Sequence, residues 1–243
     1  MKRTFASLLL VAGSVAPLSA QGFGNLLKKP APSSSSPKVD VGAAMLAGAS
    51  MIGFVTIATD QGMKAMDLMM EVFPPEKVAK VKLLNLQYKE LAAKRKDGNI
   101  DAEQLKVASS AGQEMAAIQG DWKSYKKEKS AVVTKANSRL GLMLGADAVA
   151  ASAAPATLAS LQEAGKSLAS NPMQAGKAAQ ISAQVAVLSA VVAQIPQQTK
   201  SFSTVRGIVS NIAKAEKITL APDVSTDKVK DQASLSTSAK ELD

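Results

Sequence analysis

The sequence contains no cysteine and no histidine. Without cysteine the chain can form no disulfide, and it lacks the residue that a bacterial lipoprotein anchor requires. Without histidine it lacks the commonest general base, the commonest zinc ligand and the usual partner of a nucleophilic serine. We therefore expect no catalytic residue, no cofactor and no metal site, and zinc hydrolases and Ser-His enzymes are excluded in their usual form.

Aromatic residues are scarce, at 3% of the 243 residues. A buried core must then be made mostly of Ala, Leu, Val, Met and Ile, and the small side chains among these suit close helix packing better than sheets. The chain is also basic, with 29 Lys and Arg against 20 Asp and Glu. These features predict an all-α fold, an elongated, Ala-rich helical bundle with a basic surface.

The first 20 residues have the pattern of a cleavable signal peptide. Lys2 and Arg3 precede an uncharged stretch, 4–16, and the small residue Ala20 follows at the cleavage position. The apolar core is shorter than the ~20 residues that a membrane-spanning helix needs. We expect cleavage before Gln21 and export to the periplasm or the medium of a bacterial cell. An uncleaved membrane anchor is the alternative.

Composition divides the mature chain into three parts. Residues 21–38 form a Pro- and Ser-rich linker that includes the run KPAPSSSSPK. Residues 39–217 carry the apolar periodicity of helices and form the predicted helical domain. Residues 218–243 are rich in Asp, Lys, Ser and Thr and poor in apolar residues, which predicts a disordered tail.

An antiparallel helical hairpin is predicted from about 76–96 and 101–135. Apolar residues recur at three- and four-residue steps in both arms, so that each arm has one apolar face. The turn between the arms contains Gly98, and Asp101 with Gln104 has the spacing of a capping box. Two facing apolar seams joined by a tight turn predict packing like that of a coiled coil.

The most unusual segment of the mature chain is 41–59, which carries no charge. Its small residues have the four-residue spacing that lets helices approach closely, at Ala44 with Gly48 and at Ala49 with Gly53. A buried helix of a soluble bundle explains the pattern, since a helix that is apolar on all sides is enclosed on all sides. The alternative is a segment that inserts into a membrane or associates with another helix, because about 19 residues is near the minimum for spanning.

A cluster of lysines surrounds the single tryptophan in the run WKSYKKEK, at Lys123, Lys126, Lys127 and Lys129. Aromatic and basic residues together are typical of surfaces that bind nucleic acids or other anionic polymers. An exported protein rarely meets nucleic acid, and the predicted hairpin turns Trp122 and Tyr125 toward its seam. We expect a solvated basic face, with an anionic membrane surface or an acidic polymer as its partner if it has one.

Three residues interrupt the apolar pattern of the second half. Asp147 lies alone in an apolar run, and we expect it to cap a helix or to pair with a lysine; an acid with a raised pKa at a functional site is the alternative. Pro155 is predicted to interrupt a helix, and Pro196 is predicted to end one.

Together these patterns predict a function but name no specific activity. We expect an exported, non-enzymatic helical protein of the cell envelope, with a structural or interaction role and with a second copy or another protein as partner. The alternative is a membrane-active helical protein that inserts segment 41–59 into a bilayer.

Overall fold

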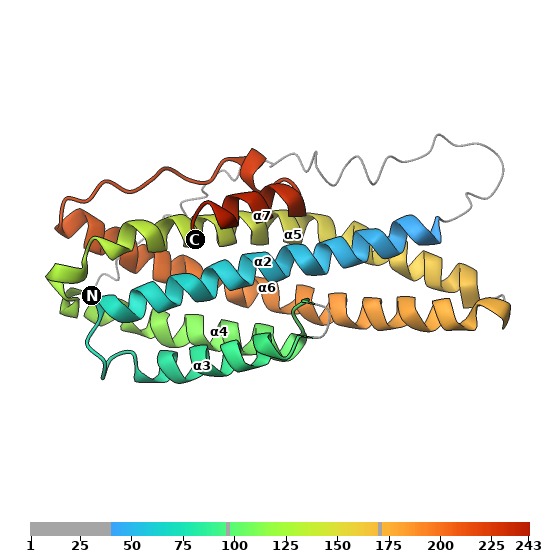
Figure 1. Cartoon of the computed structure of the whole chain (residues 1–243), viewed down its shortest axis with the longest axis horizontal. Helices are drawn as coiled ribbons and strands as arrows, with labels where there is room; N and C mark the ends of the chain where they lie inside the picture. The colour runs from blue at the N-terminus through green and yellow to red at the C-terminus, as the bar shows by residue number, and fades with distance from the viewer. Residues whose placement is uncertain (1–39, 96–97, 170–171) are drawn as a thin grey trace, which may run out of the picture.

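The computed structural model describes residues 40–95, 98–169 and 172–243 (Figure 1). The predicted signal peptide, 1–20, and the predicted linker, 21–38, lie outside the described residues. Within the described part the fold is all-α, as predicted, and no strand is present. The α-helices are α2 (Val41–Val72), α3 (Ala79–Ala93), α4 (Ala102–Ala116), α5 (Val132–Ala169), α6 (Ala175–Ala215) and α7 (Gln232–Lys240), and short 3₁₀ turns lie between some of them.

Three long helices, α2, α5 and α6, run the length of the bundle (Figure 1). The side chain of Asp40 caps α2, because its Oδ1 accepts a hydrogen bond of 3.0 Å from the backbone N–H of Ala43. The helix ends at Val72, two residues before Pro74, because a residue that precedes proline is forced toward an extended conformation. Phe73 has that extended conformation.

The predicted helical hairpin is confirmed as α3 and α4, which lie side by side along one flank of the bundle (Figure 1). Asp101 and Gln104 form the predicted capping box, and Gly98 adopts the left-handed backbone conformation of the turn at φ +69°. The second arm is shorter than predicted, since α4 ends at Ala116 and the chain continues as a 3₁₀ turn, Ala117–Ser124.

The predictions for the two prolines were wrong, because α5 continues through Pro155 and α6 continues through Pro196. A proline inside a helix removes one backbone hydrogen bond and crowds the preceding turn. Both prolines lie on the exposed side of their helices. The carbonyl that each leaves without a partner therefore faces water, and the packing of the opposite side keeps each helix continuous.

The prediction of a disordered C-terminal tail was also wrong. Residues 218–225 run along α5, and α7 then packs against α2 and α5 (Figure 1). Asp231 caps α7 by accepting a hydrogen bond of 2.8 Å from the N–H of Ser234. Three apolar side chains of this region are buried, namely Val229, Leu235 and Ala239, and four others are partly buried against the core, namely Ile218, Leu220, Val224 and Leu242. Few apolar residues are enough here because each fits onto a surface that the long helices already provide.

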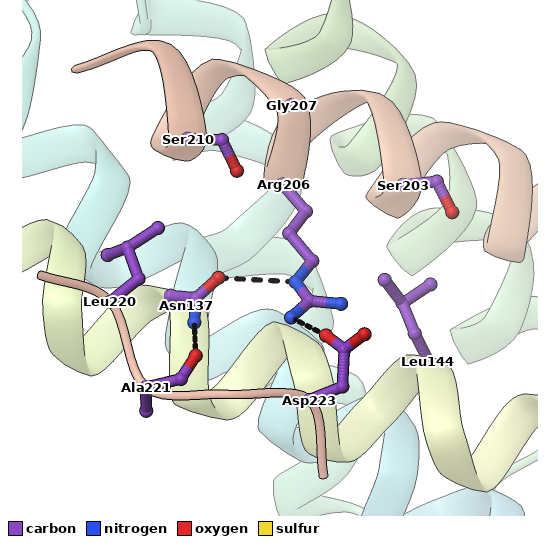
Figure 2. Close-up of a pocket in the computed structure, with 9 residues that line it drawn as sticks. All are labelled: Asn137, Leu144, Ser203, Arg206, Gly207, Ser210, Leu220, Ala221 and Asp223. Carbon is purple, nitrogen blue, oxygen red and sulfur yellow. Dashed lines mark hydrogen bonds and ion pairs between the residues drawn. The ribbon is translucent and has the colours of Figure 1, made fainter. Parts of the chain in front are cut away.

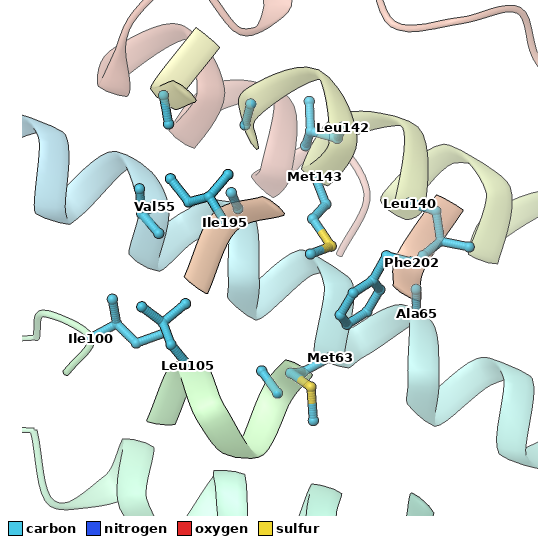
Figure 3. Close-up of a cluster of buried hydrophobic side chains, with 14 of the residues drawn as sticks. Val55, Met63, Ala65, Ile100, Leu105, Leu140, Leu142, Met143, Ile195 and Phe202 are labelled. Atoms are coloured by element: carbon cyan, nitrogen blue, oxygen red, sulfur yellow. The ribbon is translucent and has the colours of Figure 1, made fainter. Parts of the chain in front are cut away.

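The thickest part of the core lies where α4 joins the three long helices (Figure 3). Phe202 is fully buried there, and glycines on α2 and α4 make room for its ring. A Cβ at Gly62 would lie 3.0 Å from this ring, and one at Gly112 would lie 2.9 Å from it. The surrounding side chains are also large and fully or almost fully buried, among them Met63, Leu105, Leu140 and Met143.

Candidate functional site

At one end of the bundle three helices project beyond the rest, at the right of Figure 1. We call this part the three-helix lobe; it comprises residues 41–52 of α2, 153–169 of α5 and 175–194 of α6. The remainder, in which α3, α4 and α7 surround the other ends of the same helices, is called the charge-rich half. The lobe has three charged residues, Glu163, Lys166 and Lys177, all near its tip.

Small residues set the spacing of the helices in the lobe. A Cβ at Gly48 would lie 2.9 Å from Leu161 of α5, so only glycine permits this approach. Gln184 of α6 donates a hydrogen bond of 3.3 Å to the carbonyl oxygen of Met45. These contacts fix the relative positions of all three helices with few polar interactions.

The four small residues predicted to form a helix-association or membrane face are divided between the interior and the surface. Ala44 and Gly48 are buried between α2 and the other two long helices. Gly53 is buried against α7, where its Cβ would lie 2.4 Å from the side chain of Gln232. Ala49 is exposed. Three of the four therefore serve packing inside this chain.

Three helices, α2, α5 and α6, are long and apolar enough to cross a membrane by length and composition alone. The most apolar stretch of α2 has 56% of its residues buried in the bundle, and that of α5 has 50%. The corresponding stretch of α6 has only 22% buried. Of the three stretches, that of α6 is therefore the least enclosed by the rest of the chain.

The exposed face of α6 in the lobe carries no charge from residue 178 to residue 193. Its exposed side chains are Ala179, Ala183, Ala186, Val187 and Ala193 together with the polar Gln180, Ser182 and Ser189. The sequence indicates this face, because residues 178–199 form an uncharged run that is longer than segment 41–59. Leu46 of α2, 69% exposed, adds to the apolar surface of the lobe. We refer to residues 178–193 of α6 as the α6 face.

The predicted basic cluster lies at the opposite end of the bundle, where α2 and α6 end. Lys123, Lys127 and Lys129 are exposed, whereas Lys126 is half-buried and its backbone N–H donates to the carbonyl oxygen of Val72. Among the described residues none of these four lysines forms an ion pair. They are available to an anionic partner.

The aromatic residues of the same run have structural contacts. Trp122 stacks on Tyr125, with 6.2 Å between ring centroids, and the Lys123 ammonium lies 5.9 Å from the centre of the Trp122 ring. The Tyr125 hydroxyl donates a hydrogen bond to Glu216 just after α6, which raises the pKa of the tyrosine. These rings therefore join the 3₁₀ turn to the end of α6.

Asp147 neither caps a helix nor pairs with a lysine, so both expectations for it were wrong. It lies in the middle of α5, is fully buried, and accepts a hydrogen bond of 3.1 Å from Thr199 of α6 at one oxygen. Its other oxygen has no hydrogen-bond partner. Burial raises the pKa of this carboxyl to about 7, with the Thr199 bond opposing the shift.

Several cavities open on the charge-rich half, and two of them adjoin the long helices. The first, of about 410 Å³, lies between α5, α6 and the segment 220–223, and Arg206 is its principal charged group (Figure 2). The second, of about 330 Å³, lies between α2, α3 and α7. In the described parts of the chain no three carboxylates lie close enough together to hold a metal ion.

The chain was compared with models of protein families, with curated proteins and with solved structures, and it matches none of them.

Proposed function

We propose that this chain is an exported, non-enzymatic interaction protein of the cell envelope, and that it associates side by side with a second copy through the α6 face. One observation carries the proposal: the most apolar stretch of α6 is only 22% buried within the chain. An uncharged helix face of this length on an otherwise charged protein is typical of a surface that is covered in use.

Charge favours a second copy as the occupant. The whole chain has a formal net charge of +9, so most of its surface repels an identical molecule. Residues 178–193 have no charge, and their alanines allow two helix backbones to approach closely. A twofold axis through this face would bring the same small residues of both copies together.

The exposed area of the lobe is also large enough for association between two copies. A helix segment of 20 residues is about 30 Å long. With α5 beside it at a helix diameter of about 10 Å, the exposed face offers on the order of 600 Å². A stable dimer of standard size buries about 800 Å² per partner. The surface is therefore of the right order for a specific but modest association.

The test is the mass of the mature chain, residues 21–243, by sedimentation velocity over a range of concentrations. We expect a dimer that dissociates on dilution, and a monomer at every concentration from Ala186→Lys, which places a charge on the α6 face. Ala215→Lys is the matched control, because it adds the same charge at an exposed alanine of the same helix outside the lobe. A wild-type protein that stays monomeric throughout would overturn the proposal.

A second function is supported by a different observation, the presence of three helices with the length and composition of membrane spans. In this alternative the exposed basic cluster, Lys123 to Lys129, meets an anionic membrane surface first, and apolar segments that include 41–59 then enter the bilayer. Segment 41–59 would have to leave its contacts with α5 and α6 to do so, which is costly for residues such as Met51 and Phe54 that are fully buried.

Flotation with phosphatidylglycerol vesicles separates the two functions. If the protein only self-associates, it stays with the soluble fraction at physiological salt, and Lys127→Gln with Lys129→Gln changes nothing. If it is membrane-active, it floats with the vesicles and resists release by high salt, since apolar insertion is not screened.

A further inference from the structure

The cavity in Figure 2 is lined by groups of two kinds. The polar groups come from α6 and belong to Arg206, Ser203 and Ser210. The apolar side chains are Leu144 of α5 and Leu220 of the segment that follows α6. Its volume of about 410 Å³ lies in the range that holds small organic ligands. Asn137 and the carboxylate of Asp223 also line the cavity, so its one cation is already paired. If the pair with Asp223 opens, the cation and the apolar wall fit a small molecule with one charged and one apolar end.

The guanidinium of Arg206 is held in a fixed position by two different partners. Its Nε donates a hydrogen bond of 3.2 Å to Asn137 of α5, whose own Nδ2 donates to the carbonyl oxygen of Ala221 at 3.3 Å. Its Nη2 donates to Asp223. The arginine side chain is 25% exposed, whereas that of Asp223 is 84% exposed. An anion arriving from solvent can therefore replace the aspartate without disturbing the buried contact to Asn137.

Two serine hydroxyls, one on either side of Arg206 along α6, are free to donate a hydrogen bond to a bound anion. The side-chain hydroxyls of Ser203 and Ser210 form no hydrogen bond with any residue in the described part of the chain, and Figure 2 shows both residues on the same helix as Arg206. A hydroxyl can donate to an oxyanion whose charge the guanidinium balances.

Gly207 keeps one wall of the cavity open. It follows Arg206 on α6, and a Cβ built there would meet no atom within 4 Å. Glycine in the middle of a helix is destabilising relative to alanine, so its presence at this position has a cost that packing does not explain. A side chain at position 207 would occupy space that the cavity now contains.

We infer that this cavity is a binding site for a small organic oxyanion, a carboxylate or a phosphate monoester with an apolar body. Arg206 holds the anion in place of Asp223, one of the two flanking serines, Ser203 or Ser210, donates to an oxygen of the anion, and the apolar body lies against Leu144 and Leu220. The inference is independent of the proposed self-association, since the cavity belongs to the charge-rich half and the α6 face to the lobe.

The test is a titration of the isotopically labelled mature chain with benzoate and with phenyl phosphate, followed by NMR at the Gly207 amide and the Arg206 side chain. We expect saturable shifts with at least one probe, and the tighter of the two identifies the acid class. Benzyl alcohol, which lacks the charge, should bind at least tenfold more weakly, as expected from the loss of a charge-assisted hydrogen bond.

Three variants decide the outcome. Gly207→Leu fills the cavity and should abolish the shifts, while Gly176→Leu makes the same change at another open position of α6 and should leave the affinity unchanged. Asp223→Asn removes the competing carboxylate and should tighten binding severalfold. The inference is overturned if neither probe gives saturable shifts, if Gly207→Leu binds as well as the wild type, or if Asp223→Asn weakens binding.

Discussion

The charge-rich half and the three-helix lobe are built from the same three long helices, yet different interactions hold them together. In the charge-rich half, α3, α4 and α7 enclose large buried side chains such as Phe202 and Met143. Hydrogen-bonded ion pairs then join neighbouring helices at its edge, for example Arg95 with Asp60. In the lobe six of the 14 buried positions are alanine or glycine, and among the described residues polar contacts between helices are few.

This difference explains why further helices pack around α2, α5 and α6 in the charge-rich half but not in the lobe. Large side chains separate helices enough for additional helices to pack around them, whereas small side chains draw three helices close and leave their outer faces open. The burial of α6 follows this division: Phe202, Val205, Ile208 and Val209 are fully buried, but most positions between Ala179 and Ala193 are not. The lobe is therefore the part that an external partner would complete.

Two aspartates illustrate the contrast. Asp60 meets a complete set of donors: Arg95 contacts both its oxygens, at 3.0 and 3.1 Å, and the Tyr88 hydroxyl donates to it at 2.5 Å. Asp147 lies near the junction with the lobe, and among the described residues it accepts a hydrogen bond from the Thr199 hydroxyl alone. Burial without further donors raises the pKa of Asp147 to about 7.

The largest effect is expected from the pH dependence of stability at Asp147. The pKa of this carboxyl is about 7 in the folded chain against an ordinary value of 3.8. Between these values the folded state holds a proton that the unfolded state has released, so stability falls as the pH rises from about 4 to 7 and is then constant. At 1.36 kcal/mol per pKa unit, the loss is up to about 4 kcal/mol.

Asp147→Asn isolates this contribution from that of other carboxylates. The free energy of unfolding, measured by urea denaturation across this pH range, should decline for the wild type relative to the variant as the pH increases. Asp231 and Asp243 have lowered pKa values, because of a backbone hydrogen bond from Ser234 and a side-chain hydrogen bond from Lys64 respectively, and their opposite trend cancels in the difference. A constant difference between the two proteins at all pH values would contradict the assignment.

A smaller loss of folding stability is expected when Arg95 of the charge-rich half is replaced. Arg95→Met leaves Asp60 with Tyr88 alone and also breaks the 2.9 Å hydrogen bond from Arg95 to Gln104. Breaking a buried pair costs about 3–5 kcal/mol, and the Asp60 side chain is 36% exposed, so we expect about 3 kcal/mol at neutral pH.

The matched control is Lys89→Met, which removes an ion pair to Asp67 on the same two helices. Both side chains of that pair are exposed, at 56% and 36%, and such pairs contribute less than about 1 kcal/mol. Thermal or urea unfolding measures both variants. Equal losses of stability in the two variants would show that the Arg95–Asp60 pair contributes no more than an exposed ion pair. Ion pairing would then no longer distinguish the charge-rich half from the lobe.

Local sequence signals predicted part of the charge-rich half. The scarcity of aromatics indicated helices, and the spacing of Asp101 and Gln104 located a capping box. Each of these depends on residues within a few positions of one another, so a single sequence contains all the information.

The remaining features depend on contacts between distant parts of the chain. Pro155 and Pro196 are tolerated because the opposite faces of their helices are packed, and α7 is ordered because α2 and α5 offer it a surface. Asp147 meets Thr199, 52 residues away. The cavity at Arg206 likewise requires α5, α6 and the segment after α6 to meet. No local pattern contains these pairings, although the uncharged stretch 178–199 was visible.

The smallest expected effect compares one glycine from each region. Gly207→Ala in the charge-rich half places its Cβ in open space, so the variant gains helix propensity and should be stabilised by about 0.5–1 kcal/mol. Gly48→Ala in the lobe gains the same propensity, but its Cβ would lie 2.9 Å from the end of the Leu161 side chain, which is fully buried and would have to shift. Crowding a packed interior costs about 1–3 kcal/mol, so this variant should lose about 1 kcal/mol net. Urea denaturation of the two variants and the wild type measures the change in the free energy of unfolding, which should be a gain for Gly207→Ala and a loss for Gly48→Ala. A gain from Gly48→Ala would mean that the lobe is loosely packed, and close approach of its helices would no longer explain why it leaves its outer faces open.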